Sequence, residues 1–473
     1  MDASPTILGR GLTRLAWVAV TGTLSLRRQA ARVGALAVEG VSWEAVVLAA
    51  AFPILFIHAR YQPTIHVGLR STTVGIQLAD FAVLAVVIAA LVAGVQRGWA
   101  TLRPGVALWT ATGLWFVWIG IEILIPHGTA GYPAAKHTVT GAKFLEYALL
   151  APSFVLIVRR RSDLRLLLVV VTAWSVLASA VGLIQFFGAN IFVSGATGGR
   201  QLSFLGFHDF ASLSSAALLL GVVALAFPRL AIQRRLGWTA IAAGAVGVIL
   251  SAAIAAVVGI VAACIGLLAV LVSRHDLIVR RLIPVGLVVA VALLGAIGMR
   301  STDLGRYLGL SHETKAQRAG VESYAHRSLL VWIGWRIFRD HPVAGVGWEA
   351  SGDPSRFESY IPAAKRRFPT DPPISFPSPQ HPWGVQNFYV QTLADLGVIG
   401  LLLVVAMFAA ALWLAVSGLR VRSSYATLGL AWLVVVAGLW IAMGIVAGIP
   451  LDALTWLTLG LAAASPFAVS ARG

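Results

Sequence analysis

Long apolar runs, separated by short segments rich in arginine, dominate the sequence. A helix needs about 20 apolar residues to cross the hydrocarbon core of a bilayer. The pattern predicts an all-α fold, a polytopic membrane helix bundle with about 12 transmembrane helices and a large, partly helical extracytoplasmic loop. The predicted spans are 41–57, 74–95, 105–125, 142–158, 166–188, 205–227, 238–252, 254–273, 282–299, 387–417, 427–448 and 452–470.

The apolar run 238–273 is too long for one ordinary span and short for two. A single span would put the arginines on its two sides on opposite faces of the membrane, so two spans are favoured. Near the N-terminus, the apolar segment 15–26 lies between arginines and is too short to cross a bilayer. Residues 1–40 are therefore predicted to form a cytoplasmic amphipathic segment at the membrane surface, and no cleavable signal peptide is evident.

Composition supports a membrane protein and excludes a cytosolic enzyme or a secreted domain. Of the 473 residues, 58% are hydrophobic and only 12% are charged, whereas a soluble domain has about 25% charged residues. The net charge of +17 would suit a nucleic-acid partner, but the position of the charges argues against one. With a cytoplasmic N-terminus, 20 arginines lie in cytoplasmic segments and 5 Lys and Arg residues lie in the short outer loops. This asymmetry predicts cytoplasmic termini and an outer segment 300–386.

The chain is therefore predicted to have four parts: the cytoplasmic segment 1–40, helices 1–9 over 41–299, an extracytoplasmic (periplasmic) loop domain over 300–386, and helices 10–12 over 387–473. The loop domain is the only long hydrophilic stretch. Apolar residues recur within 322–340 at spacings of three and four, which predicts a helix that ends before Pro342. The proline-rich run that follows is expected to be stiff and extended, and to hold His381 close to the membrane.

Polar residues enter the span that follows the loop. Asn387, Gln391 and Asp395 are spaced four residues apart and share one helical face. Polar groups in a membrane helix face either protein or a wet cavity. Both readings are open from the spacing alone: these residues serve a substrate site, or they form hydrogen bonds between helices.

Two stretches resemble the family of O-antigen ligases and O-antigen polymerases, which are bacterial membrane glycosyltransferases. The first begins at Arg327 and resembles the family's arginine, aromatic helix and acidic-x-Pro-x-x-Gly-x-Gly; it ends in Asp340-His341-Pro342-Val343-Ala344-Gly345-Val346-Gly347. The second is similar to the family's His-Asn-x-x-Leu-x-x-Leu-Ala-Glu-x-Gly-x-x-Gly; it includes Asn387-Phe388-Tyr389-Val390-Gln391, Leu393-Ala394-Asp395-Leu396-Gly397 and Gly400-Leu401. The resemblance covers the chain from about residue 74 onward.

The resemblance implies an enzyme of the bacterial inner membrane that acts at its outer face in cell-envelope polysaccharide or lipopolysaccharide synthesis. Its donor would be a glycan on undecaprenyl pyrophosphate, and its acceptor a hydroxyl of a glycan or glycolipid. The transfer would be inverting and would use no cofactor, nucleotide or metal. Arginines would bind the pyrophosphate, because a guanidinium stabilises the leaving charge, and a loop histidine would activate the acceptor hydroxyl. No Asp-x-Asp motif of a metal-dependent transferase occurs in the chain.

The resemblance also implies the residues that bind the donor. Arg200 matches the arginine before the family's sixth span, and the pair His208-Asp209 stands where the family often has His-Pro-Asn. The family's Ser-Arg at the start of its eighth span has no arginine counterpart after Ser251. A pyrophosphate in a site with little water needs at least two cations, so Arg318 or Arg327 is expected to be the second.

The acceptor side departs from the family at one position. Gln386 stands directly before Asn387, where many members have a histidine. His381, five residues earlier, is therefore expected to be the catalytic base. Asn387 and Gln391 are expected to line the floor of the substrate-binding site, with Arg200 and His381 facing one cavity.

Two other classes of function are open from the sequence. A proton-coupled transporter or a lipid-linked sugar flippase would use carboxylates inside the spans, and four polar residues lie there: Asp80, Glu122, Glu146 and Gln185. That reading predicts loss of function when Asp80 or Glu146 is changed, but it leaves the outer loop without a role. A non-catalytic scaffold is the third reading. The sequence does not distinguish a ligase from a polymerase.

Overall fold

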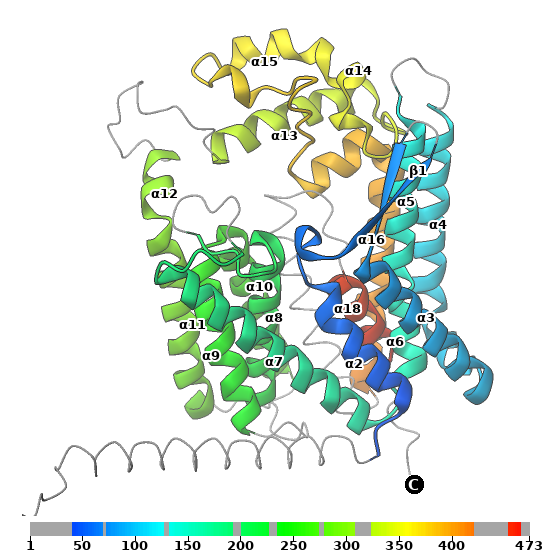
Figure 1. The fold of residues 1–473 in the computed structure, drawn as a ribbon, viewed down its shortest axis with the longest axis vertical. Helices are drawn as coiled ribbons and strands as arrows, with labels where there is room; N and C mark the ends of the chain where they lie inside the picture. Colours follow the sequence, from blue (N-terminus) through cyan, green and yellow to red (C-terminus); the bar gives the residue numbers. More distant parts are fainter. Residues whose placement is uncertain are drawn as a thin grey trace, which may run out of the picture.

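The computed structural model describes residues 40–69, 72–126, 132–192, 200–226, 234–273, 279–307, 323–420 and 453–464. Within these ranges, 7 helices are long and apolar enough to cross a membrane. The fold is a multi-pass helix bundle to which one small sheet is added (Figure 1). The predicted span 427–448, Arg318 and all but the last residue of the predicted segment 1–40 lie outside the described residues.

Each predicted span within the described ranges overlaps a helix. The span 142–158 overlaps a pair of helices that together begin earlier, at Ala134, and the span 74–95 begins in a strand. The helices of the bundle are α2 (Trp43–Leu55), α3 (Leu78–Arg97), η2 (Ala100–Gly105), α4 (Val106–Leu124), α5 (Ala134–Ala148), α6 (Leu150–Ile157), α7 (Arg161–Phe186), α8 (Phe207–Ala226), α9 (Arg234–Ser251), α10 (Ile254–Ser273), α11 (Val279–Met299), α16 (Phe388–Arg420) and α18 (Ala453–Ala464).

The long apolar run 238–273 forms two helices, α9 and α10, as the positions of the flanking arginines predict. They are separated at Ala252, whose φ of +47° is a left-handed conformation that interrupts a helix. α8 and α9 pack so closely that a Cβ on Gly244 would lie 2.4 Å from the backbone nitrogen of Leu218. This contact holds the middle of α9 against the middle of α8.

A β-hairpin corrects the prediction of a span that begins at residue 74. After the short helix η1 (Ala59–Tyr61), strands β1 (Thr64–Leu69) and β2 (Thr72–Gln77) pair antiparallel, and α3 begins only at Leu78. Hydropathy alone does not separate a strand from the start of a helix in a short apolar run rich in β-branched residues. The switch to helix is fixed by Asp80, whose Oδ2 accepts a hydrogen bond from the backbone N–H of Gln77 (2.7 Å).

Residues 323–387, here called the loop unit, lie across one end of the bundle, at the top of Figure 1. The helix predicted over 322–340 is present as α13 (Ser323–Asp340). The short helices that follow are not predicted by the sequence pattern. Around this unit the structure has α12 (Ser301–Tyr307), α13, η4 (Ala350–Gly352), α14 (Pro354–Phe357), η5 (Glu358–Tyr360), α15 (Ile361–Arg367) and η6 (Pro373–Ser375).

The loop unit has its own apolar core, built from Leu329, Leu330, Ile333, Ile337, Phe357 and Phe376 among others. The proline-rich run that was expected to be extended instead contains the short helix η6. Beyond it, Ser378 and His381 exchange two backbone hydrogen bonds (3.0 Å each) in a turn. The loop unit is therefore a packed structure and not an irregular connection.

The two sequence stretches that resemble family motifs meet where the loop unit joins α16. The backbone N–H of Val346 donates to the carbonyl of Ala394 (3.0 Å), and the N–H of Val398 donates to the carbonyl of Pro342 (2.9 Å). α16 is broken at Gly397 (φ +66°), where a Cβ would lie 2.1 Å from the oxygen of Val343. These glycine-rich stretches thus hold the loop unit on the bundle.

Candidate functional site

The predicted donor-binding residue Arg200 lies in the segment that leads into α8. Its guanidinium carbon is 4.2 Å from the centre of the Phe207 ring, and its Nε donates a hydrogen bond to the carbonyl of Ser251 (3.0 Å). Ser251 ends α9, and the last carbonyls of a helix have no partner within it. Arg200 therefore caps the break between α9 and α10 and keeps a charge at the end of the bundle.

Arg327 reaches the same region from α13 of the loop unit. Its Nε donates to Oε1 of Gln386 (3.1 Å), directly before α16. The charges of Arg200 and Arg327 both act on the ring of His208, the second residue of α8. The fold thus brings these two predicted cations together around His208, although they are far apart in the sequence.

His326, next to Arg327 on α13, is a histidine that the sequence analysis did not select. It is only 6% exposed, and its ring meets the edge of Trp383 with the ring centres 5.2 Å apart. The backbone of Ser375 hydrogen-bonds the ring, while Nε2 is buried and has no hydrogen-bond partner. Burial lowers the pKa of His326, and the positive charge of Arg327 lowers this pKa further.

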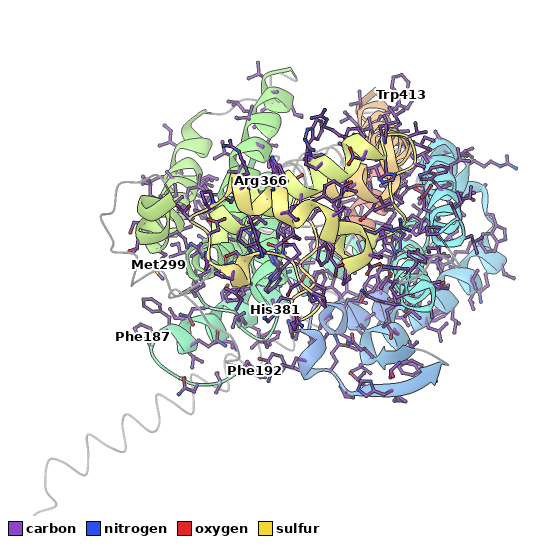
Figure 2. All side chains as sticks on the ribbon, turned by 90° about the horizontal axis from the view of Figure 1, so that it is seen from above. Phe187, Phe192, Met299, Arg366, His381 and Trp413 are labelled. Atoms are coloured by element: carbon purple, nitrogen blue, oxygen red, sulfur yellow. The ribbon has the colours of Figure 1, made fainter. Side chains whose placement is uncertain are left out.

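The predicted base His381 also packs against Trp383, but it lies at the surface. Its ring is exposed and stacks on Trp383 with the ring centres 5.9 Å apart. Its backbone N–H donates to Oγ of Ser378 (3.1 Å). Figure 2, which looks down onto the loop unit, shows His381 beside the helices of that unit. Trp383 therefore has two histidines as neighbours, one buried and one open to solvent.

The other predicted site residues continue from this point into α16. Oδ1 of Asn387 accepts a hydrogen bond from the backbone N–H of Val390 (3.0 Å), so Asn387 caps the helix. The side chain of Gln391 hydrogen-bonds Asp395, whose Oδ1 accepts a bond from the N–H of Ser351 (2.8 Å). Asp395 thus fastens the loop unit, while Asn387 lies beside the contact between Gln386 and Arg327.

A second polar cluster, also not selected by the sequence analysis, joins α5 to the loop unit. Nε2 of the fully buried His137 lies 2.7 Å from Oδ2 of Asp353. Tyr132 stacks on the His137 ring with the ring centres 4.9 Å apart. Burial, together with the negative charge of Asp353, raises the pKa of Tyr132 well above its usual value. No local sequence signal marks this cluster, because its members come from distant segments.

Two of the polar residues inside the spans are bound to neighbouring chain segments. Asp80 forms an ion pair with Lys143 (2.8 Å) in addition to its bond from the strand before it. Oε1 of Gln185 accepts a hydrogen bond from the N–H of Ser203 (2.8 Å), which holds the segment before α8. Oε1 of Glu122 is buried without a hydrogen-bond partner.

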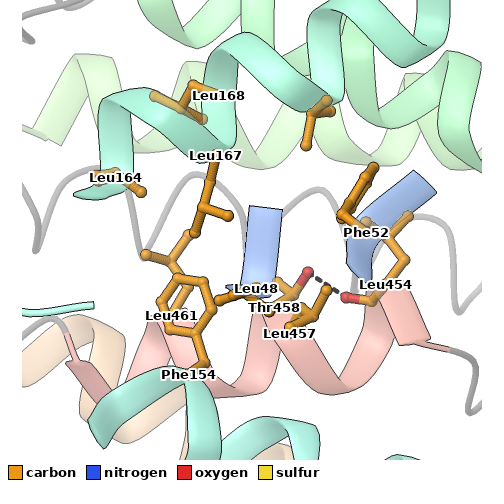
Figure 3. Close-up of a pocket in the computed structure, with 11 residues that line it drawn as sticks. Leu48, Phe52, Phe154, Leu164, Leu167, Leu168, Leu454, Leu457, Thr458 and Leu461 are labelled. Carbon is orange, nitrogen blue, oxygen red and sulfur yellow. Dashed lines mark hydrogen bonds between the residues drawn. The ribbon is translucent and has the colours of Figure 1, made fainter. Parts of the chain in front are cut away.

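The structure also has an apolar cavity within the bundle. A cavity of about 50 Å³ lies between α2, α6, α7 and α18, lined by leucines, Phe52 and Phe154 (Figure 3). Thr458 also lines the cavity, and its hydroxyl donates a hydrogen bond to the carbonyl of Leu454 (2.7 Å) within α18. The lining thus offers little for chemistry. Among the described residues, no group of three or more His, Cys, Asp or Glu side chains could hold a metal ion.

Comparison with known families gives one match. The model of the O-antigen ligase family matches residues 202–405. This segment begins just after Arg200 and includes His208, the loop unit and the first half of α16. No curated protein matches the chain.

Proposed function

Since the model of the O-antigen ligase family matches residues 202–405, we propose that this chain belongs to that family and that it transfers a glycan from a polyprenyl-pyrophosphate carrier to an acceptor hydroxyl. The carrier is undecaprenyl pyrophosphate, and the acceptor is a glycan or a glycolipid. The reaction takes place at the extracytoplasmic face of the bacterial inner membrane, where 300–386 forms the periplasmic loop domain. The enzyme inverts the configuration at the anomeric carbon and needs no metal.

The observation that carries this proposal is the convergence of Arg200 and Arg327 on His208. When the glycosidic bond breaks, its electron pair leaves with the pyrophosphate, whose negative charge increases. Two guanidinium groups from different elements are suited to this charge, because each offers a planar fork of donors and remains protonated. Positive charges held in place by the fold stabilise this developing negative charge without having to reorganise during the reaction.

The acceptor supplies the second half of the reaction. Its hydroxyl oxygen forms a bond to the anomeric carbon, the bond from that carbon to the pyrophosphate oxygen breaks, and the hydroxyl proton passes to a base. A histidine beside Trp383 is suited to this role; His381 is the one that the sequence predicts. Asn387 and Gln391 line the floor of the acceptor site next to Gln386, which bonds Arg327.

A proton-coupled transporter or a flippase has less support. Asp80 is committed to an ion pair with Lys143 and to the start of α3, and Gln185 holds the segment before α8. The carboxylate of Asp80 is thus already paired and Gln185 carries no ionisable group, so that reading would have to rest on Glu122 and Glu146. The packed loop unit also has no role in that reading.

The experiment is deletion of the gene, followed by analysis of the cell-surface glycan and of the lipid-linked glycan. A ligase predicts loss of long chains from the acceptor while polymer accumulates on the lipid carrier. A polymerase predicts products limited to a single repeat. Plasmid-borne wild-type protein restores the pattern in either case. An unchanged glycan ladder, with no accumulation on the carrier, would exclude the proposed transfer.

A further inference from the structure

His326 is a buried polar group that the arginine site does not use. Its Nε2 has no hydrogen-bond partner, and the side chain is 6% exposed. Buried polar nitrogens in proteins nearly always have a partner, because an unmade hydrogen bond costs free energy. An imidazole nitrogen kept in this state calls for an explanation, and binding of a substrate hydroxyl supplies one.

The surroundings also determine which nitrogen of His326 can act as a base. The backbone of Ser375 hydrogen-bonds the ring, and since Nε2 has no partner, this bond uses Nδ1. A backbone carbonyl only accepts hydrogen bonds, so Nδ1 carries the hydrogen and Nε2 carries the free lone pair. A lone pair at Nε2 is what the removal of a hydroxyl proton requires.

The charges around His326 keep it ready for that step. The charged group that acts on it is Arg327, which lowers the pKa together with burial, while the Ser375 backbone opposes this effect. Trp383, which packs on the ring, is uncharged, and His381 lies on the same indole. At neutral pH His326 is therefore unprotonated. A bound pyrophosphate would neutralise Arg327 and make His326 more basic when the donor is in place.

We propose that His326 is the catalytic base of the transfer, a role that rests on the proposed function. The acceptor oxygen bonds to the anomeric carbon as the bond to pyrophosphate breaks, and the hydroxyl proton goes to Nε2 of His326 and then to water. The polyprenyl pyrophosphate leaves towards Arg327, on the same turn of α13, and Arg200. Nε2 of His326 is buried. The acceptor sugar therefore reaches it by displacing the ring of Trp383, which packs against His326.

The test compares His326→Ala with His341→Ala, which removes an exposed histidine at the other end of α13. Full-length protein in lipid nanodiscs receives the lipid-linked glycan extracted from the deletion strain and the acceptor glycolipid of the same strain. His326→Ala is expected to lower kcat by about 10²–10⁴-fold, the range for loss of a general base. His341→Ala is expected to leave the rate unchanged. Both are expected to bind geranylgeranyl pyrophosphate, a donor-like probe, with the wild-type Kd.

Azide separates a base from a structural residue. It attacks the anomeric carbon without a proton to remove, so His326→Ala is expected to form glycosyl azide at a rate close to wild type. His326→Gln, which keeps more of the packing, serves if the alanine variant does not fold. A wild-type protein that makes no glycosidic product would exclude the proposed function itself. An active wild type with full transfer by His326→Ala, or without azide rescue, would exclude only His326.

The pH profile gives an independent measurement. A base with a pKa below the usual 6.5 places the acidic limb of kcat/KM below that pH, with the rate rising as pH rises. Arg327→Gln removes a positive charge, so the His326 pKa rises and the limb moves to higher pH even though the rate falls. A limb that disappears in His381→Ala and remains in His326→Ala would return the role to His381.

Discussion

Nε2 of His137 lies 2.7 Å from Oδ2 of Asp353, and the side chain of His137 is fully buried. The two residues belong to α5 and to the turn before α14, so this contact fastens the loop unit to the bundle. Lys136 approaches the same carboxylate at 3.8 Å but is 56% exposed. The buried contact therefore contributes more to stability than the exposed one.

This difference predicts that His137→Ala and Asp353→Ala each destabilise the protein by about 1–3 kcal/mol, the cost of leaving a buried partner unsatisfied. The double variant should cost less than the sum, because the second change removes a partner already lost. Thermal unfolding of the four proteins in one detergent measures the coupling. Lys136→Ala is the control and should shift Tm little. Strict additivity of the two buried substitutions would show that the pair is not coupled.

The junction between the family motifs predicts a strong effect of small substitutions. Gly397→Ala places a Cβ 2.1 Å from the oxygen of Val343 in a backbone conformation that favours glycine. The variant is expected to unfold at a lower temperature and to lose activity because the loop unit shifts. Gly384→Ala is the matched control within the loop unit, since a Cβ there meets nothing within 4 Å. Equal Tm values for the two variants would contradict the close fit.

The bundle could be predicted from sequence because the length of an apolar run is a local property. The helix α13 was predicted from the three- and four-residue spacing of its apolar side chains, which is also a local property. The strand β2 was missed because its apolar residues merge with those of α3. The short helices of the loop unit were missed because they lack a long apolar period, and their stability comes from contacts with Phe357 and Phe376 in the unit's core.

Only part of the candidate site could be predicted from the sequence. Arg200 and Arg327 were selected by resemblance, and the fold brings them to one histidine. His326 and the pair of His137 with Asp353 depend on contacts between distant segments. A single sequence carries no sign of such contacts, because burial and missing partners are properties of the folded chain.

The predicted topology leads to a labelling experiment. Arg366 lies exposed on α15, so Arg366→Cys in a Cys264→Ala background gives a chain with one thiol. A membrane-impermeant maleimide added to intact spheroplasts is expected to label it, because the positive-inside pattern places the loop domain outside. Labelling that requires lysis of the spheroplasts would reverse the orientation.

Metal independence is a further prediction. The chain has no Asp-x-Asp motif, and arginines can stabilise the leaving pyrophosphate without a bound cation. Transfer by purified protein is expected to continue at an unchanged rate after treatment with EDTA. Loss of activity that Mg²⁺ or Mn²⁺ restores would mean that a bound cation, in addition to the arginines, stabilises the leaving pyrophosphate.

The last prediction concerns the two arginines themselves. Removing one fixed charge from the leaving group is expected to lower kcat by about 10²-fold or more, as loss of one donor at a developing charge does in other enzymes. Arg200→Lys and Arg327→Lys keep the positive charge but lose the planar guanidinium that can donate two hydrogen bonds to one phosphate. Their kcat should therefore lie between those of the alanine variants and the wild type. Arg366→Ala, an exposed arginine of the loop unit, is the control and should keep the wild-type kcat.

The combined variant distinguishes a shared site from two separate ones. Arg200 and Arg327 are proposed to bind one pyrophosphate, so the loss in Arg200→Ala with Arg327→Ala should fall short of the product of the single losses. Steady-state kinetics with the lipid-linked donor measures kcat and KM for all four proteins. Since Arg200 also donates to the carbonyl of Ser251, Tm is recorded for each variant. Exact multiplication of the two losses, at unchanged Tm, would mean that the arginines act on different charges.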